Sequence, residues 1–326
     1  MPDWAEAILL GIIEGITEFL PVSSTGHLLI AQRWVSQQTA LFNTIIQVGA
    51  ALAVGLVFRE RINKLIQNRE DSASREYLKK LAFAFILTGI GGLTLKKIGL
   101  ELPETVAPVA WATLIGGVIF VFIERRRTKQ GRGESGTEEI TWAIALAVAA
   151  AQLVAATFPG TSRSGATIMI ALVLGMRRAA ATEFSFLVGI PTLLSAGVYE
   201  AGKAIQQNNP PTPDEWQMLG IGAATAAVTA ALAVRWLMRF IQTHSFVAFG
   251  WYRIILGATL LALGEGPRNE MGPKEGREMK RHRAESKSYS QEENPQKTGA
   301  EFSAQAKETT AERPAKSAPE SARQPR

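Results

Sequence analysis

The chain has 326 residues, of which 47% are hydrophobic, and a formal net charge of +6. It contains no cysteine, which excludes disulfides, thiol catalysis and thiolate metal sites. No dense basic patch with interleaved aromatic residues occurs, so we expect no nucleic-acid partner.

The chain divides into two parts of very different composition. Residues 1–264 are strongly apolar, whereas residues 265–326 hold 13 Lys and Arg against 11 Asp and Glu, with two aromatic residues. So polar a segment cannot bury enough apolar surface to fold alone. We therefore predict a membrane-embedded domain at 1–264 and a charged, disordered C-terminal tail at 265–326.

Apolar segments recur along the first part, which predicts an all-α polytopic membrane protein. Leu41–Phe58 has 18 residues without a charge, or about 27 Å as a helix, enough to cross the hydrocarbon core of a bilayer. A large soluble helical bundle is the alternative, but its helices would alternate apolar and polar faces. Gly89, Gly91 and Gly92 are expected to be small packing positions. The other apolar runs are Ala5–Leu20, Leu28–Val35, Leu81–Leu95, Val106–Ile123, Ile140–Phe158, Thr167–Leu174, Phe184–Tyr199, Trp216–Leu237 and Val247–Leu263.

The charged connections predict the topology, because basic loops stay in the cytoplasm. Arg59–Lys80 and Glu124–Glu139 are the most basic connections, and Glu200–Glu215 is acidic. Counting spans between them gives six transmembrane helices and two re-entrant helical hairpins, with both termini outside. The hairpin Ala5–Val35 enters from the outer face and Ile140–Leu174 from the inner face. Halves of opposite topology indicate an inverted repeat.

The stretch from Glu14 to His27 places ionisable and hydroxyl side chains in the first hairpin. Glu14 and Glu18 are four residues apart, so on a helix they share a face, about 6 Å apart at Cβ. Two carboxylates this close in an apolar setting repel, unless one stays protonated or a cation holds both. Pro21 then ends the predicted helix. The side chains that follow it are Ser23, Ser24, Thr25 and His27.

A second stretch, Phe158–Thr167, lies at the bend of the other predicted hairpin. It combines the hydroxyls of Ser162, Ser164 and Thr167 with the guanidinium of Arg163. Hydroxyls, backbone N–H groups at a helix start and a guanidinium together predict a phosphate cradle. Non-helical backbone at membrane depth is tolerated only where it is buried in protein or lines a cavity. We therefore expect both stretches to line one cavity.

These residues resemble a known family. The pattern E-G-x-T-E-F-L-P-V-S-S-T-G-H at 14–27 and P-G-x-S-R-S-G-A-T at 159–167 are similar to the two signature motifs of undecaprenyl-diphosphate phosphatases of the bacitracin-resistance type. The resemblance extends over about residues 1–264. It implies a multi-pass enzyme of the bacterial plasma membrane that removes the terminal phosphate from a polyprenyl diphosphate, which recycles the lipid carrier for cell-wall synthesis. It also implies a divalent cation and an active site that opens to the outer face.

The resemblance implies roles for individual residues. Glu14 and Glu18 match the family's acidic pair that acts with the metal, Ser24 its candidate nucleophile and His27 its essential histidine. Arg163, with Ser162 and Ser164, matches its phosphate-binding loop. Mg²⁺ or Ca²⁺ is the expected cation, because the ligands are all oxygen atoms. Ser23, Thr25 and Thr167 are further substrate-binding candidates.

Several alternatives remain open at this point. Ser24 could attack with His27 as its base, or His27 or Glu18 could activate water directly. A polyprenyl-phosphate flippase is the alternative function, since inverted repeats are a transporter architecture, but translocation does not need the Glu-Glu-Ser-His set.

Three further polar residues have weaker expectations. Glu183 is either a site residue or the partner of Arg177 or Arg178, and Gln47 and Gln152 are expected to form interhelical hydrogen bonds. The expected partners are the lipid substrate and the bilayer, and a homodimer is left open.

Overall fold

The computed structural model describes residues 2–36, 38–100, 102, 104–130, 136–206 and 210–264. Within these ranges the protein is a bundle of helices without a β-strand, which confirms the all-α prediction. The predicted tail, 265–326, lies outside the described residues. The helices are α1 (Asp3–Thr17), α2 (Ser24–Ala31), α3 (Ala40–Val57), α4 (Arg59–Gln67), α5 (Ser72–Ile98), α6 (Val106–Lys129), α7 (Trp142–Thr157), α8 (Arg163–Val173), α9 (Arg178–Gln206), α10 (Pro213–Thr243) and α11 (Val247–Leu263).

Five of the described helices, α3, α5, α6, α9 and α10, are long and apolar enough to cross a membrane. Their outward-facing side chains are apolar as well; Leu56 on α3 is 69% exposed and Phe122 on α6 is 63% exposed. The helices α7, α8 and α11 are shorter and also apolar. This arrangement agrees with a polytopic membrane protein.

Some helices extend beyond their apolar runs. Val247–Leu263 has the predicted bounds, but α5 begins at Ser72 rather than Leu81. It starts there because the Asp71 carboxylate caps it, accepting a hydrogen bond from the Ser74 backbone N–H at 3.2 Å. An apolar run therefore predicts that a helix is present, but it does not predict the residues at which the helix begins and ends.

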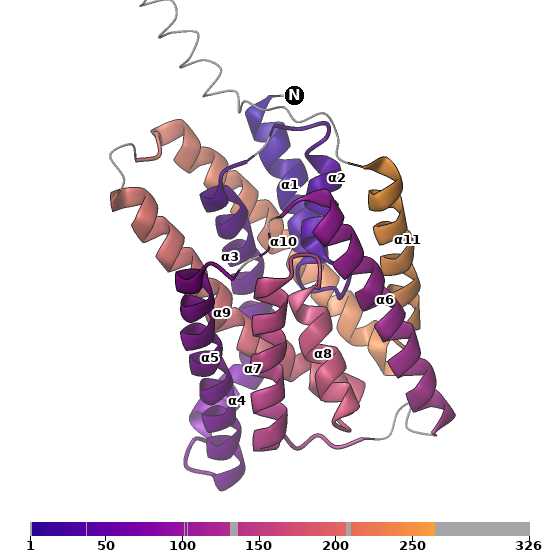
Figure 1. Ribbon diagram of the computed structural model, residues 1–326. Coiled ribbons are helices and arrows are strands. Elements are labelled where there is room, and N and C mark those ends of the chain that lie inside the picture. The colour runs from indigo at the N-terminus through magenta and orange to yellow at the C-terminus, as the bar shows by residue number, and fades with distance from the viewer. Residues whose placement is uncertain are drawn as a thin grey trace, which may run out of the picture. The chain divides into compact units, whose positions relative to one another are not determined.

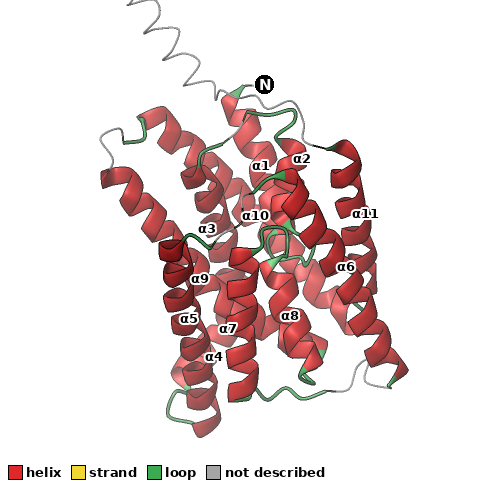
Figure 2. Ribbon diagram, viewed as in Figure 1, coloured by secondary structure: helices red, strands yellow, loops and turns green. Residues whose placement is uncertain are grey.

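Two helical hairpins approach the centre of the bundle from opposite ends (Figure 1). Helices α1 and α2 form the first, and α7 and α8 form the second. Their bends, residues 18–23 and 158–162, lie near the middle, where Figure 2 draws them as loops. Pro21 lies in the first bend as predicted, although α1 already ends at Thr17.

Small residues allow the central helices to cross closely. A Cβ added to Gly49 of α3 would lie 2.8 Å from the Cα atom of Ala223 on α10, so no larger residue fits there. Gly91 of α5 is a packing position as predicted, because an added Cβ would lie 2.7 Å from Leu153 Cδ2 on α7. The same prediction is wrong for Gly89 and Gly92, whose added Cβ atoms would meet no atom within 4 Å.

A buried ion pair joins α6 to α9. Arg178 donates to both carboxylate oxygens of Glu124, at 3.1 and 2.8 Å, and Glu124 is fully buried. The predicted pairing of Glu183 with Arg177 or Arg178 is therefore wrong. Glu183 instead pairs with Arg61 of α4 at 2.7 Å, because α4 lies in the connection between α3 and α5 and reaches α9.

Replacing Glu124 with glutamine should destabilise the fold, because it leaves the Arg178 guanidinium buried without its countercharge. Removing one partner of a buried ion pair costs about 3–5 kcal/mol, so the thermal unfolding midpoint in detergent should fall. The matched control is Glu183→Gln, because its pair with Arg61 is partly exposed and contributes about 0–1 kcal/mol. Equal midpoints for the two variants would contradict this interpretation.

Candidate functional site

The two bends end in the same strained backbone conformation. Ser23 and Ser162 have φ angles of 74° and 67° and are the only non-glycine residues with positive φ in the described ranges. Each serine hydroxyl accepts a hydrogen bond from the N–H three residues later, that of Gly26 at 3.4 Å and that of Gly165 at 3.2 Å. These bonds cap the N-termini of α2 and α8. Such strain costs about 1–3 kcal/mol and persists where the surroundings fix the conformation, often at functional sites.

Glu18, Ser24 and Arg163 form the polar centre between the bends. The Arg163 guanidinium donates to one Glu18 carboxylate oxygen, and the Ser24 hydroxyl donates to the other at 2.8 Å. The side chains of Arg163 and Glu18 are only 21% and 8% exposed, so water screens their attraction little. One carboxylate thus joins the second hairpin to the first.

A cavity of about 590 Å³ surrounds this centre. It extends between α3, α5, α7 and α9, and both motifs line it, as the sequence predicts. Among the predicted site residues, those that line it are Glu18, Ser23, Ser24, Thr25, Ser162 and Arg163. Gln47 of α3 and Gln152 of α7 also line it. Gln152 donates an interhelical hydrogen bond to Thr88 at 3.0 Å, as expected.

Glu14 is a fully buried carboxylate whose two oxygens have no hydrogen-bond partner. Glu18, Gln47 and Arg163 are near enough to interact with it electrostatically. A buried polar group without a partner is costly, and carboxylate oxygens are the ligands that hard divalent cations take. Glu14 and Glu18 therefore fit a cation whose other ligands are phosphate and water oxygens. Among the described residues, no group of three or more His, Cys, Asp or Glu side chains gathers to hold a metal, so this site offers two carboxylates and no third such ligand.

Ser164 connects the two hairpins, whereas Thr167 bonds within α8. The Ser164 hydroxyl lies 3.2 and 3.1 Å from the backbone carbonyls of Glu18 and Leu20 in the first bend. The Thr167 hydroxyl donates to the Arg163 carbonyl at 2.8 Å within α8. Both side chains are buried, and neither lines the cavity.

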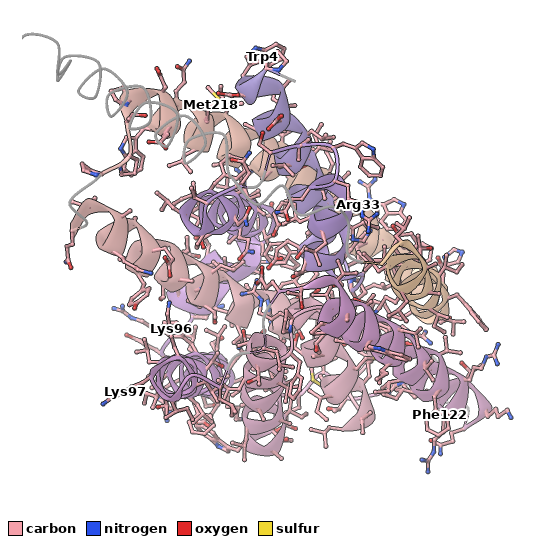
Figure 3. All side chains as sticks on the ribbon, turned by 45° about the horizontal axis from the view of Figure 1, so that its top comes forward. Trp4, Arg33, Lys96, Lys97, Phe122 and Met218 are labelled. Atoms are coloured by element: carbon pink, nitrogen blue, oxygen red, sulfur yellow. The ribbon has the colours of Figure 1, made fainter. Side chains whose placement is uncertain are left out.

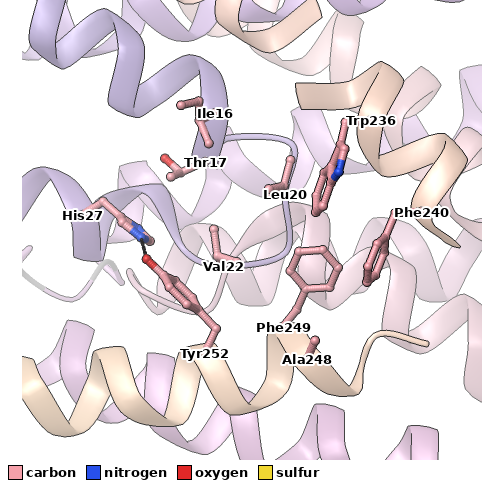
Figure 4. Close-up of a pocket in the computed structure, with 10 residues that line it drawn as sticks. All are labelled: Ile16, Thr17, Leu20, Val22, His27, Trp236, Phe240, Ala248, Phe249 and Tyr252. Carbon is pink, nitrogen blue, oxygen red and sulfur yellow. Dashed lines mark hydrogen bonds between the residues drawn. The ribbon is translucent and has the colours of Figure 1, made fainter. Parts of the chain in front are cut away.

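His27 lies in a second, apolar cavity of about 330 Å³ (Figure 4). Its Nδ1 is 2.8 Å from the Ser23 carbonyl and its Nε2 is 2.6 Å from the Tyr252 hydroxyl. A carbonyl only accepts hydrogen bonds, so we assign the proton to Nδ1, and Nε2 accepts from Tyr252. Glu18, rather than His27, contacts the Ser24 hydroxyl.

Arg253 is a site-supporting residue that the sequence reasoning did not use. It is fully buried on α11, and it donates to the backbone carbonyl of Gly160 in the second bend at 3.2 Å and to that of Thr113 on α6 at 3.3 Å. The Thr113 hydroxyl donates to the same Gly160 carbonyl at 3.1 Å. The sequence did contain a signal for Arg253, because it is a charged residue inside the apolar run Val247–Leu263. Ionisable residues within membrane-spanning segments rarely lack a role.

Comparison with known proteins agrees with the motifs. The family model described as "Bacitracin resistance protein BacA" matches residues 7–259. A protein of Rhizobium johnstonii named undecaprenyl-diphosphatase is 47% identical over 262 residues, which cover 80% of this chain and 97% of the relative. A protein of Xylella fastidiosa with the same name is 45% identical over 262 residues, covering 78% and 96%.

The strained serine of the second bend should respond unusually to substitution. Ser162→Ala loses the cap and keeps an unfavourable φ, so it should destabilise the protein by about 1–2 kcal/mol. Ser162→Gly should be milder, because glycine adopts positive φ readily. The control is Thr141, which caps α7 with φ −86°; there the difference between alanine and glycine should be smaller. Thermal unfolding of the four variants in detergent checks this, and an equal difference at both sites would contradict it.

Proposed function

The chain belongs to the bacitracin resistance protein BacA family and is an undecaprenyl-diphosphatase, and we propose that Glu18, Ser24 and Arg163 carry out its hydrolysis. The observation that carries this proposal is the Glu18 carboxylate, which accepts hydrogen bonds from both Ser24 and Arg163. A nucleophile, a proton acceptor and an anion-binding group thereby meet in one cavity. No observation favours the polyprenyl-phosphate flippase.

Arg163 binds the terminal phosphate in this proposal. A guanidinium can donate two parallel hydrogen bonds to phosphate oxygens, and Arg163 is the first residue of α8, where free backbone N–H groups also attract an anion. Donors fixed in place before the reaction stabilise the charge that develops in the transition state. When the phosphate binds, its oxygens accept some of the hydrogen bonds that Arg163 otherwise donates to Glu18.

Ser24 attacks the terminal phosphorus atom. As its Oγ forms the new P–O bond, its proton passes to Glu18, and the bond to the bridging oxygen breaks, which leaves undecaprenyl phosphate. Glu18 gives this proton to the departing oxygen of undecaprenyl phosphate and is a carboxylate again. A water molecule then attacks the phosphoserine with Glu18 as its base, the bond between phosphorus and Ser24 Oγ breaks, and Ser24 recovers a proton from Glu18 as inorganic phosphate leaves. In the variant without a serine intermediate, the same Glu18 carboxylate deprotonates a water that attacks the phosphorus directly. The predicted base role of His27 stays a prediction.

A divalent cation, Mg²⁺ or Ca²⁺, completes the proposed site. Glu14 and Glu18 would hold it, because the Glu14 oxygens are buried without a partner and Glu18 is its neighbour. The bound cation supplies charge neutralisation for the diphosphate. Ser23, Thr25 and Ser162 are proposed to contact the phosphates, since all three line the cavity.

We further propose an inverted repeat in which both hairpins are re-entrant. The pairing of helices supports it: α1 packs on α10 as α7 packs on α5, and α3 packs on α10 as α9 packs on α5. The counterparts α3 and α9 pack on each other, and so do α6 and α11. The shared conformation of Ser23 and Ser162 supports it as well.

Six spans follow from the repeat: the five long helices and α11, whose 17 residues measure about 25 Å, near the lower limit for a span. The basic connections place the α4 side in the cytoplasm of a bacterial plasma membrane. The cavity then opens toward the outer face, the side on which Lys96, Glu104 and Glu200 line it.

Arg163→Lys should lower phosphate release about 100-fold, because losing one transition-state hydrogen bond costs on the order of 3 kcal/mol. Ser24→Ala should lose at least as much if serine is the nucleophile. The measurement is steady-state phosphate release from saturating undecaprenyl diphosphate. The control is Arg177→Lys, since Arg177 pairs with Glu138 at the surface. An Arg163→Lys variant within a few-fold of wild type would make Arg163 a brace for the hairpin.

Glu14→Gln should lose its response to Mg²⁺ together with its activity, because the change keeps the shape of the side chain and removes its charge. Phosphate release is titrated with Mg²⁺ for wild type, Glu14→Gln and Glu183→Gln, the last being a carboxylate outside the cavity whose pair with Arg61 is partly exposed. Glu18→Gln should behave like Glu14→Gln. An active Glu14→Gln variant with an unchanged titration would show that the acidic pair does not hold the cation.

A further inference from the structure

Two positions on the face of α5 that borders the catalytic cavity are glycines without a side chain. Gly89 and Gly92 are one helical turn apart, and both line the cavity that contains Glu18, Ser24 and Arg163. A Cβ atom added to either glycine would meet nothing within 4 Å. Glycine inside a helix costs about 1 kcal/mol relative to alanine, and here no closely packed neighbour requires it. The open space itself is therefore the feature that needs an explanation.

Small residues of α9 form the opposite wall. Thr192, Ser195 and Ala196 also line the cavity at helical spacing. We call the space between these three residues and Gly89 and Gly92 the α5–α9 slot.

The two helices meet beyond both ends of the slot. At one end the rings of Tyr77 and Phe184 lie 5.8 Å apart. At the other end Lys96 pairs with Glu200 at 3.1 Å and lies 4.4 Å from the Tyr199 ring. Figure 3 shows Lys96 near α9. The slot is thus a bounded opening between two helices that touch above and below it.

The slot leads to the apolar surface of the protein. Leu93 lines the cavity on α5 and is 61% exposed. Leu93 belongs to the apolar part of a helix long enough to span a membrane, so its exposed side chain is expected to face lipid chains. A volume of about 590 Å³ is that of a site for a drug-sized ligand, about 300–1,000 Å³. An undecaprenyl chain is much longer than such a ligand, so most of it must lie outside the cavity.

We propose that the α5–α9 slot is the passage for the isoprenoid chain of the substrate. The diphosphate binds at Glu18, Ser24 and Arg163, and the chain runs between the two glycines and α9 into the bilayer. The Lys96–Glu200 pair closes the polar end of the slot, so the chain leaves through its apolar stretch. This inference rests on the proposed function of the same cavity.

The chain offers a direct test because it contains no cysteine. Gly89→Cys and Gly92→Cys are each made alone and labelled with N-ethylmaleimide in detergent. Undecaprenyl phosphate at about ten times its Kd should slow labelling of both variants roughly tenfold by mass action. Inorganic diphosphate, which has no chain, should leave the labelling rate of both unchanged.

Two control variants identify where the chain lies. Gly220→Cys, on α10, also has open space around its Cβ position and lines neither cavity, so the lipid should not protect it. Ala248→Cys lies in the apolar cavity beside His27 and should also label at an unchanged rate. Protection at Ala248→Cys alone, absence of protection at both glycine positions, or equal protection of all four variants would overturn the proposal.

A second measurement uses larger side chains at the same positions. Gly92→Leu should lower kcat/KM for undecaprenyl diphosphate by at least tenfold, whereas Gly220→Leu should not change it. An unchanged kcat/KM for Gly92→Leu would overturn the proposal. Failure of the proposed function is distinct, because wild type would then release no phosphate from the lipid, whatever the labelling pattern.

Discussion

The ion pair between Glu18 and Arg163 joins two hairpins that approach from opposite ends of the bundle. Desolvation offsets much of the Coulomb attraction of a buried pair, so such a pair contributes little to net stability. Its value here is positional, because it fixes a carboxylate between a guanidinium and the Ser24 hydroxyl. The bonds of Ser164 to the first bend and of Arg253 to the second hold the backbone around it. A site this dependent on geometry needs both bends to be held from several sides.

The two bends use one backbone design to supply two different chemical groups. In each, the residue directly after the strained serine is the one that bonds the Glu18 carboxylate: Ser24 follows Ser23, and Arg163 follows Ser162. In the proposed mechanism, equivalent positions thus provide the nucleophile from one side and the anion-binding group from the other. A repeat that was chemically identical in both halves would bring two serines or two arginines together, and neither combination could both bind and cleave a phosphate.

The sequence predicts much of this because apolar length and charge spacing act locally. The apolar runs predict the long helices, and the position of Pro21 predicts the first bend. By contrast, the contacts of a side chain with a helix distant in sequence cannot be predicted from local spacing. His27 contacts Tyr252, which is 225 residues away, and spacing within the first motif could not reveal that. Likewise, the sequence does not distinguish Gly89 from Gly91, since both are small residues of one helix. Only the packing of the neighbouring helices shows that Gly91 is in close contact with Leu153 of α7, whereas Gly89 borders the open slot.

The distance along the chain between Glu18 and Arg163 has a consequence for biogenesis. The partners are 145 residues apart, which a ribosome takes about 7–30 s to translate at 5–20 residues per second. During that interval the first hairpin lacks the Arg163 guanidinium, whose positive charge later pairs with Glu18. Until the second hairpin arrives, the charge of Glu18 must be balanced by water, a proton or a bound cation. Assembly of the centre is consequently a late event, because Arg163 is synthesised only after the whole first hairpin is complete.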